Sequence, residues 1–201
     1  MKECYSRVAA IEDNKVWLDK TVFFAFSGGQ ASDKGTINGI NVLEAVKQNE
    51  DEIYYILEKE PDFAVGDNVK VEIDWDYRYK IMKIHSAAHI VYYYFIEKVG
   101  QQKVIGSNIS IDKARLDFAY DESVGLLLEE IQEKTNNTIK EGIDIKTFQD
   151  EKDPTRRFWE CGKWLMPCGG THVKNTKEIG QIKLKRKNIG AGKERIEVIL
   201  V

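Results

Sequence analysis

Over residues 1–74, apolar and polar positions alternate in short runs, a pattern typical of half-buried β-strands. β-branched and aromatic residues concentrate at residues 5–11, 16–18, 22–26, 53–57 and 69–73. Turn-forming residues such as Asp13-Asn14, Asn38-Gly39 and Gly66-Asp67-Asn68 separate these runs. Short strands of this kind, with no helical run among them, predict a small β-barrel.

The pattern changes at Asp74-Trp75-Asp76, where a helical period begins. An aspartate there can cap the start of a helix, and Gly100 is suited to end it. Apolar residues recur at helical spacing as far as Val99, at Ile81, Ile84, Ala88, Val91, Tyr92 and Phe95. The sequence therefore predicts one long helix directly after the barrel.

The remainder of the chain mixes both periods. An extended stretch at residues 104–118 precedes a second amphipathic helix, and extended stretches follow at 143–148, 179–184 and 196–201. The apolar positions of this second helix are Val124, Leu127, Leu128, Ile131 and Ile139. We therefore predict an α+β fold, with a β-barrel domain at residues 1–74 and an α/β two-layer domain at 75–201.

Composition narrows the possible functions. The 201 residues carry 30 basic and 33 acidic side chains, so no global positive field favours nucleic acid, and a polyanion would need a local patch. No run approaches the ~20 apolar residues of a membrane span, and the N-terminus lacks an apolar signal core. We expect a cytoplasmic protein, in which three cysteines are thiols or metal ligands rather than disulfides.

All three histidines fall in two short motifs with ligand spacing. His85 and His89 lie four residues apart in the predicted helix, which places both imidazoles on one face. Cys168 and His172 are also four residues apart, across two glycines that permit a tight turn. A thiolate with imidazoles is typical of zinc, so we predict a metal site formed by these four residues.

These residues are compatible with other interpretations. A zinc protease of the H-E-x-x-H type has a glutamate after the first histidine, but Ser86 occupies that position here. A closed structural zinc site also needs four ligands, so it remains an alternative. Cys161 and Cys168 could form a different metal pair, although the residues between them, 164–166, indicate a short strand. Cys4 is expected to be a buried apolar residue.

Several further segments resemble one known family. HSAAH at 85–89 follows Asp-Trp-Asp-Tyr-Arg, and GSNI at 106–109, ARLDF at 114–118 and CGGTH at 168–172 come after it in order. Together with the glycine-rich segment 26–33, these motifs resemble the alanyl-tRNA editing family of AlaX proteins, in its medium-length type. Its members are free-standing relatives of the editing domain of alanyl-tRNA synthetase, and the resemblance runs over nearly the whole chain.

Three positions depart from the family pattern. Ala25 stands where the glycine-rich motif commonly has proline, and Ser27 stands where it has a third glycine. Val104 replaces a glutamine of the synthetase editing domain, so that polar pocket contact cannot be transferred to this chain. Gly28, Gly29 and Gln30, the centre of the glycine-rich motif, are retained.

The resemblance implies an aminoacyl-tRNA hydrolase that edits alanine tRNA carrying serine or glycine. Zn²⁺ held by His85, His89, Cys168 and His172 would be the catalytic centre, with one ligand displaceable by water or substrate. The metal would orient the aminoacyl end, polarise the ester and lower the pKa of a bound water. Residues 75–201 would form the zinc-dependent editing domain.

Substrate and RNA contacts are predicted at two further sets of residues. The predicted substrate contacts, each of which could instead serve only the fold, are Gly28, Gly29, Gln30, Ser107, Asp117 and Thr171. The predicted tRNA contacts surround a turn at 188–192 and form a basic cluster with one acid, Glu194, which could instead be only a solvated face; they are Lys183, Lys185, Arg186, Lys187, Lys193 and Arg195. Arg78, Lys80 and Lys83 add positive charge beside the predicted zinc ligands.

Two other functions remain compatible with the sequence. A zinc-stabilised RNA-binding module without catalysis would have a closed four-ligand site. A metallohydrolase of small esters would not need the basic cluster.

Overall fold

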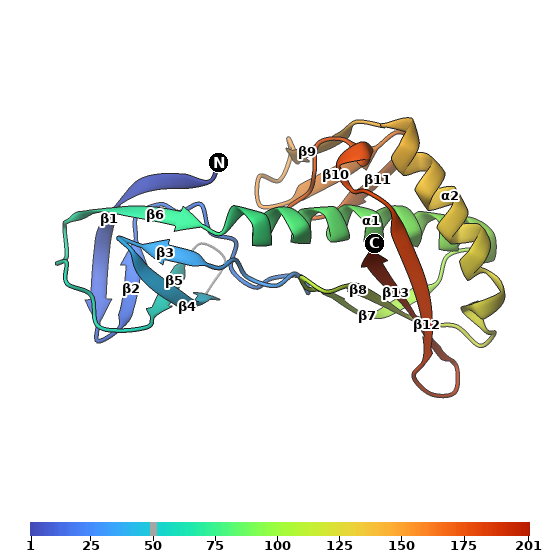
Figure 1. Ribbon diagram of the computed structural model, residues 1–201, viewed down its shortest axis with the longest axis horizontal. Coiled ribbons are helices and arrows are strands. Elements are labelled where there is room, and N and C mark those ends of the chain that lie inside the picture. The colour runs from blue at the N-terminus through green and yellow to red at the C-terminus, as the bar shows by residue number, and fades with distance from the viewer. Residues whose placement is uncertain (49–51) are drawn as a thin grey trace. The chain divides into compact units, whose positions relative to one another are not determined.

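The computed structural model describes residues 1–48 and 52–201 and divides into two compact units. Unit 1 comprises residues 1–27 and 31–79, and unit 2 comprises residues 28–30 and 80–201. The fold is α+β, as predicted, and Figure 1 shows a strand-rich N-terminal unit and a mixed second unit. The proposed boundary at residues 74 and 75 stays a prediction, and the three residues Gly28–Gln30 group with unit 2.

Unit 1 is a closed barrel in the order β1-β2-β5-β4-β3-β6, which confirms the predicted β-barrel. Every neighbouring strand pair is antiparallel, and inward residues such as Val16, Ile37 and Leu57 are fully buried. Its strands are β1 (Glu3–Glu12), β2 (Lys15–Leu18), β3 (Gly35–Ile37), β4 (Ile40–Lys47), β5 (Ile53–Leu57) and β6 (Asn68–Ile73). Alternation of buried and exposed side chains along these strands builds one apolar interior.

Three details of the barrel differ from the sequence-based prediction. Residues 22–26 are not a strand, because their N–H groups bond to side chains: Phe24 N donates to Asp33 Oδ2 over 2.6 Å, and Phe23 N donates to Thr21 Oγ1. The β3–β4 hairpin was not predicted as strands, although its turn at Asn38-Gly39 was. Cys4 is half-buried against the barrel core rather than fully buried.

The predicted long helix is present as α1 (Trp75–Val99). Asp74 caps it, since its Oδ1 accepts the Tyr77 N–H at 3.0 Å. Gly100 ends it with φ of 80°, in the left-handed region that suits glycine. Of the helices in residues 1–48 and 52–201, none is both long and apolar enough to cross a membrane.

Unit 2 contains two sheets. The larger is antiparallel, with strand order β12-β13-β8-β7, and the smaller has the order β11-β10-β9. The strands and helices of this part are β7 (Lys103–Ile109), β8 (Ala114–Ala119), η1 (Val124–Leu126), α2 (Leu128–Glu141), β9 (Ile145–Gln149), β10 (Arg157–Cys161), β11 (Trp164–Pro167), η2 (Thr176–Glu178), β12 (Ile182–Asn188) and β13 (Lys193–Leu200).

Within unit 2, α1 packs against both sheets, as Figure 1 shows. Phe95 contacts Phe118 of β8 with ring centroids 4.3 Å apart, and Tyr93 stacks on Trp164 of β11 at 5.5 Å. The buried face of the larger sheet alternates with a charged face, so one side of each strand supports the helix. This arrangement places the middle of α1 beside the segment that follows β11.

The elements of unit 2 follow the predicted order with local differences. The extended stretch at 104–118 is a hairpin of β7 and β8, and the second amphipathic segment divides into η1 and α2. Ile179 ends the 3-10 turn η2 rather than starting a strand, since its N–H donates to Thr176 O. β10 was not predicted, and the short strand expected at 164–166 is β11.

Candidate metal centre

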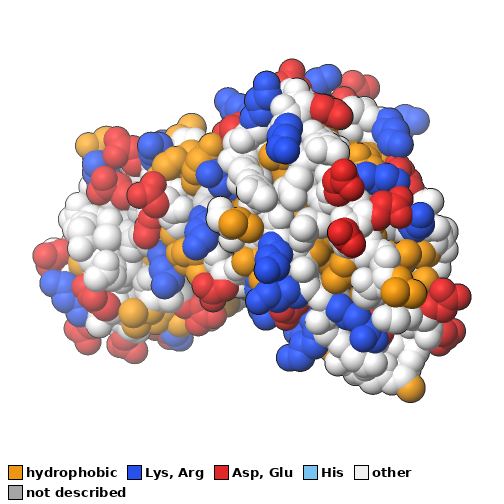
Figure 2. Space-filling view, turned by 45° about the vertical axis from the view of Figure 1, so that its right-hand side comes forward, with side chains coloured by type: hydrophobic (Ala, Val, Ile, Leu, Met, Phe, Trp, Pro, Cys, Tyr) orange, Lys and Arg blue, Asp and Glu red, His pale blue; other side chains and the backbone are white. Residues whose placement is uncertain are grey.

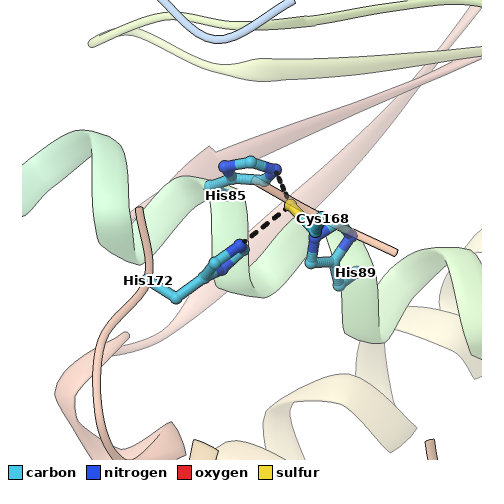
Figure 3. Close-up of side chains that lie close together, drawn as sticks. All are labelled: His85, His89, Cys168 and His172. Carbon is cyan, nitrogen blue, oxygen red and sulfur yellow. Dashed lines mark hydrogen bonds between the residues drawn. The ribbon is translucent and has the colours of Figure 1, made fainter. Parts of the chain in front are cut away.

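Four side chains from two distant parts of the chain converge in unit 2, as Figure 3 shows. His85 and His89 project from successive turns of α1, with ring centroids 4.7 Å apart. Cys168 and His172 lie on the loop after β11, and Cys168 Sγ is 3.3 Å from His172 Nε2 and 3.7 Å from His85 Nε2. One ligand atom from each residue lies within 4.8 Å of the others, so the group could hold a metal ion.

The loop that carries Cys168 and His172 depends on glycine at one position. A Cβ on Gly170 would lie 2.3 Å from His85 Cε1 and 2.7 Å from Gln30 Oε1. A Cβ on Gly169 would meet none of the described atoms within 4 Å. Gly170 is therefore required for close approach of the backbone to His85, whereas Gly169 is not.

Three backbone N–H groups of this loop donate hydrogen bonds to other groups of the protein. Gly170 N donates to Cys168 Sγ over 3.4 Å, and Thr171 N donates to Gln30 Oε1 over 3.0 Å. Cys168 N donates to Arg157 O of β10 at 2.8 Å. The N–H groups of Cys168, Gly170 and Thr171 therefore each already have an acceptor within the protein.

Burial sets the protonation of the histidines. Loss of solvation lowers the pKa of His85 to about 4, and the pKa values of His89 and His172 lie well below their usual value for the same reason, with the neighbouring histidines adding to the effect. Neutral imidazoles have the free lone pair that a metal requires. Burial also raises the pKa of the Cys168 thiol, which the Gly170 N–H and the Arg157 charge oppose.

The residues present fit a bound metal ion. His89 Nε2 is buried and has no hydrogen-bond partner among the described residues. A buried polar atom without a partner is costly, and one ring nitrogen of His89 lies within 4.8 Å of a thiol sulfur and of nitrogens of two further imidazoles. A borderline-soft cation such as Zn²⁺ would satisfy this donor set.

The glycine-rich segment adjoins these four residues within unit 2. Gln30 is 1% exposed, and its Oε1 lies 2.7 Å from His85 Nδ1, while its Nε2 donates to Thr171 Oγ1 at 2.9 Å. Gly29 O accepts the Ile109 N–H at 2.8 Å and the Asn108 Nδ2 at 3.3 Å, which joins the segment to β7. Gly28 and Gly29 have φ of 57° and 82°, so both need the conformational freedom of glycine.

The two predicted contacts on the sheet, Ser107 and Asp117, have different surroundings. Ser107 lies beside the glycine-rich segment, because a Cβ on Gly29 would be 2.7 Å from Ser107 O. Asp117 of β8 binds Arg195 of β13 through two hydrogen bonds, of 2.6 and 2.9 Å. Asp117 is 6% exposed and already neutralised, which leaves its carboxylate little capacity for an ammonium group.

The basic residues predicted to contact tRNA lie on the β12–β13 hairpin but do not share one face. Lys183, Lys185 and Lys187 alternate along β12 and are exposed, whereas Arg186 points to the other face and pairs with Glu194 at 2.5 Å. Lys193 begins β13 and is exposed. Basic and acidic side chains both spread over the face shown in Figure 2, so that face is not uniformly cationic.

Arg78 does not add a free charge beside the metal ligands. It is 8% exposed, it forms an ion pair with Asp33, and it donates to Val22 O at 3.0 Å, all within unit 1. Its positive charge is therefore neutralised inside the barrel unit.

Two residues beside these four side chains were not predicted from the sequence. Ser86 Oγ lies 3.1 Å from His172 Nδ1 and accepts the Val173 N–H at 3.3 Å. Trp159 of β10 packs against His89 with ring centroids 4.9 Å apart. The position of Ser86 between two histidines of a helix was an available signal, but Trp159 is 70 residues from His89 and has no local signature.

Comparison with known proteins places this site in a class of proteins. The family described as the threonyl and alanyl tRNA synthetase second additional domain matches residues 157–197, which include Cys168 and His172. The family described as tRNA synthetases class II (A) matches residues 1–77. The chain is thus related to aminoacyl-tRNA synthetases, and the first of these matches contains two of the four residues that could hold a metal ion.

Full-length relatives define the family more narrowly. The alanyl-tRNA editing protein AlaX-M of Pyrococcus horikoshii is 41% identical across 100% of this chain and 93% of its own length. AlaX-M of Saccharolobus solfataricus is 34% identical over 98% of this chain and 93% of its own length. An alanine–tRNA ligase of Methanococcus maripaludis is 32% identical over 97% of this chain but only 24% of the ligase. This chain belongs to the AlaX-M family of alanyl-tRNA editing proteins.

Proposed function

We propose that this protein hydrolyses the ester bond that joins a wrong amino acid, serine or glycine, to alanine tRNA. The observation that carries the proposal is the four-residue ligand group in a chain that aligns over its full length with alanyl-tRNA editing proteins. Residues 1–74 would form a barrel domain carrying the glycine-rich motif, and residues 75–201 would form the zinc-dependent editing domain.

The need for such a reaction follows from the limits of binding selectivity. A synthetase pocket shaped for alanine cannot strongly exclude the smaller glycine, and a pocket also rejects one added hydroxyl only weakly. A second, hydrolytic site supplies the missing discrimination. A free-standing protein with that site would act on tRNA after the synthetase has released it.

Zn²⁺ is the proposed cofactor, held by His85 Nε2, His172 Nε2, Cys168 Sγ and one nitrogen of His89. When bound, it would supply a Lewis acid for the ester carbonyl and for water. The chain's own groups keep the ligands ready: burial keeps the imidazoles neutral, and the Gly170 N–H bonds to Cys168 Sγ. Water or substrate would have to displace one ligand, because a tetrahedral site with four protein ligands has no free coordination position.

The substrate would lie near the loop at 168–172 and the segment Gly28–Gln30. Thr171 and Ser107 are the proposed polar contacts, since both adjoin that segment. The RNA backbone would bind the exposed lysines of β12, where an extended row of ammonium groups suits phosphates. Arg186 and Arg195 belong to ion pairs and would contribute less.

Hydrolysis of charged alanine tRNA tests the proposal. Zinc-loaded protein is expected to release serine or glycine from alanine tRNA faster than alanine, and a chelator is expected to abolish that release. Cys168→Ala is expected to lose both metal and hydrolysis. Cys161→Ala is the matched control, because Cys161 is a buried thiol of β10 outside the ligand group.

Three outcomes would contradict the proposal. Folded, zinc-loaded protein that leaves all three charged tRNAs intact would indicate a closed structural site in an RNA-binding module. Hydrolysis of a small ester at an equal rate would indicate a general esterase. Hydrolysis that survives in folded Cys168→Ala would remove the metal group from the reaction.

A further inference from the structure

Two histidines of the ligand group, His85 and His172, contact polar side chains of the protein through Nδ1. His85 Nδ1 lies 2.7 Å from Gln30 Oε1, and His172 Nδ1 lies 3.1 Å from Ser86 Oγ. In both histidines Nε2 is the nitrogen that faces Cys168 Sγ. The contact to Gln30 is the more informative one, because a hydroxyl can donate or accept whereas each atom of an amide can do only one.

The orientation of the Gln30 amide follows from its other partner. The Thr171 backbone N–H can only donate, and it lies 3.0 Å from Oε1. That atom must therefore be the amide oxygen, while Nε2 donates to Thr171 Oγ1. Since the oxygen only accepts, His85 Nδ1 must carry a proton to bond to it.

A proton on Nδ1 leaves the lone pair of a neutral His85 on Nε2, which faces the other ligands. Gln30 also joins the two halves of the ligand group, because it bonds to His85 of α1 and to Thr171 of the loop at 168–172. At 1% exposure, with both oxygen lone pairs and one amide proton engaged, it has little capacity left for a substrate.

We infer that Gln30 is a positioning residue for the metal ligands. Gln30 fixes the tautomer of His85 and the distance between His85 and the loop that carries Cys168 and His172. This role differs from the substrate contact predicted from the sequence. It rests on the zinc site of the proposed function and is independent of the RNA substrate. Mutation of a residue that hydrogen-bonds to a metal ligand typically lowers metal affinity by about 10- to 100-fold.

Metal affinity of Gln30 variants, measured by competition with a chelator in the absence of RNA, tests the inference. Gln30→Leu removes both polar atoms at similar volume and is expected to bind Zn²⁺ about 10- to 100-fold more weakly. Gln30→Glu keeps two acceptor oxygens for His85 and Thr171, so it is expected to restore most of the affinity. Gln149→Leu, at an exposed glutamine of β9, is the matched control and should match the wild type.

A second measurement reports the tautomer directly. Nitrogen NMR of the zinc-loaded wild type should show a proton on His85 Nδ1 that exchanges slowly with water, and this protection should be lost in Gln30→Leu. Thr171→Val, which removes only the Nε2 partner, covers the case in which Gln30→Leu does not fold; it should weaken zinc binding less.

Unchanged zinc affinity in folded Gln30→Leu would overturn the inference, and so would a zinc-loaded wild type with no proton on His85 Nδ1. If Gln30→Leu does not fold, unchanged affinity in Thr171→Val would overturn it. These results are distinguishable from failure of the proposed function, because absent hydrolysis of charged tRNA leaves the binding and NMR results intact. Conversely, a wild-type zinc affinity in Gln30→Leu with slow hydrolysis would restore the substrate-contact interpretation.

Discussion

At the residue scale, the geometry of the ligand group depends on the close approach of the Gly170 backbone to the His85 ring. Gly170 lies where a side chain would overlap His85, whereas its neighbour Gly169 faces none of the described atoms within 4 Å. The sequence CGGTH presents these glycines as equivalent, but only one of them makes room for an imidazole. Ser86 and Gln30 add fixed partners to two histidine rings.

Gly170→Ala is expected to destabilise the protein by about 1–3 kcal/mol and to weaken zinc binding, because the added methyl group must displace His85 or Gln30. Denaturant unfolding of the metal-free protein and chelator competition measure the two effects. Gly169→Ala is the matched control and should be close to neutral in both. Equal effects of the two substitutions would contradict the close approach at Gly170.

At the scale of the element, the β12–β13 hairpin separates its charges by face. Alternate residues of a strand point to opposite sides, so Lys183, Lys185 and Lys187 share the side opposite to the buried Leu184. Arg186 joins the other side and pairs with Glu194. The basic cluster in the sequence is therefore divided, and a single exposed row of lysines remains.

Replacing the three lysines of that row by glutamine should weaken tRNA binding and flatten its salt dependence. Each phosphate contact contributes about 0.7–0.9 to the slope of log affinity against log salt, so the slope should fall by about 2–3. Binding of uncharged tRNA at a series of salt concentrations measures it. The control is a triple glutamine variant at the exposed Lys140, Lys152 and Lys174. An equal loss in both variants would indicate net charge alone.

At the scale of the whole molecule, each of the two units is stabilised by its own contacts. In unit 1, the buried Asp33 accepts the Phe24 N–H and two bonds from Arg78, whose Nε donates at 2.6 Å. In unit 2, α1 contributes ligands and aromatic packing to the same region. One helix thus supplies residues to both units, since the division falls between Tyr79 and Lys80.

Arg78→Met is expected to lower the free energy of unfolding by about 3–5 kcal/mol, because it leaves the Asp33 carboxylate buried without a cation. Chemical denaturation at neutral pH measures this change. Lys80→Met is the matched control on the same helix, where an exposed substitution typically changes stability by about 0.5 kcal/mol or less. Similar losses in the two variants would show that the ion pair contributes nothing specific.

The sequence by itself determined the barrel, the long helix and the four residues that could hold a metal ion. The alternation of the first 74 residues, the helical period up to Val99 and the two histidine motifs are local patterns, and the barrel, α1 and the cluster agree with them. Local patterns are sufficient there because strand and helix periods arise from neighbouring residues. The strand expected at 22–26 is absent, because the side chain of Asp33, which lies outside that run, accepts the backbone N–H of Phe24.

Only the tertiary structure decided which partners each side chain has. It assigned Gln30 to His85, Asp117 to Arg195 and Arg78 to Asp33, pairs that are separated by 55, 78 and 45 residues. Hydrogen bonds and ion pairs depend on distances of a few tenths of an ångström, and residues far apart in sequence carry no periodic record of such distances. For that reason the sequence could name the four residues that could hold a metal ion, whereas the hydrogen-bond partners of those residues required the fold.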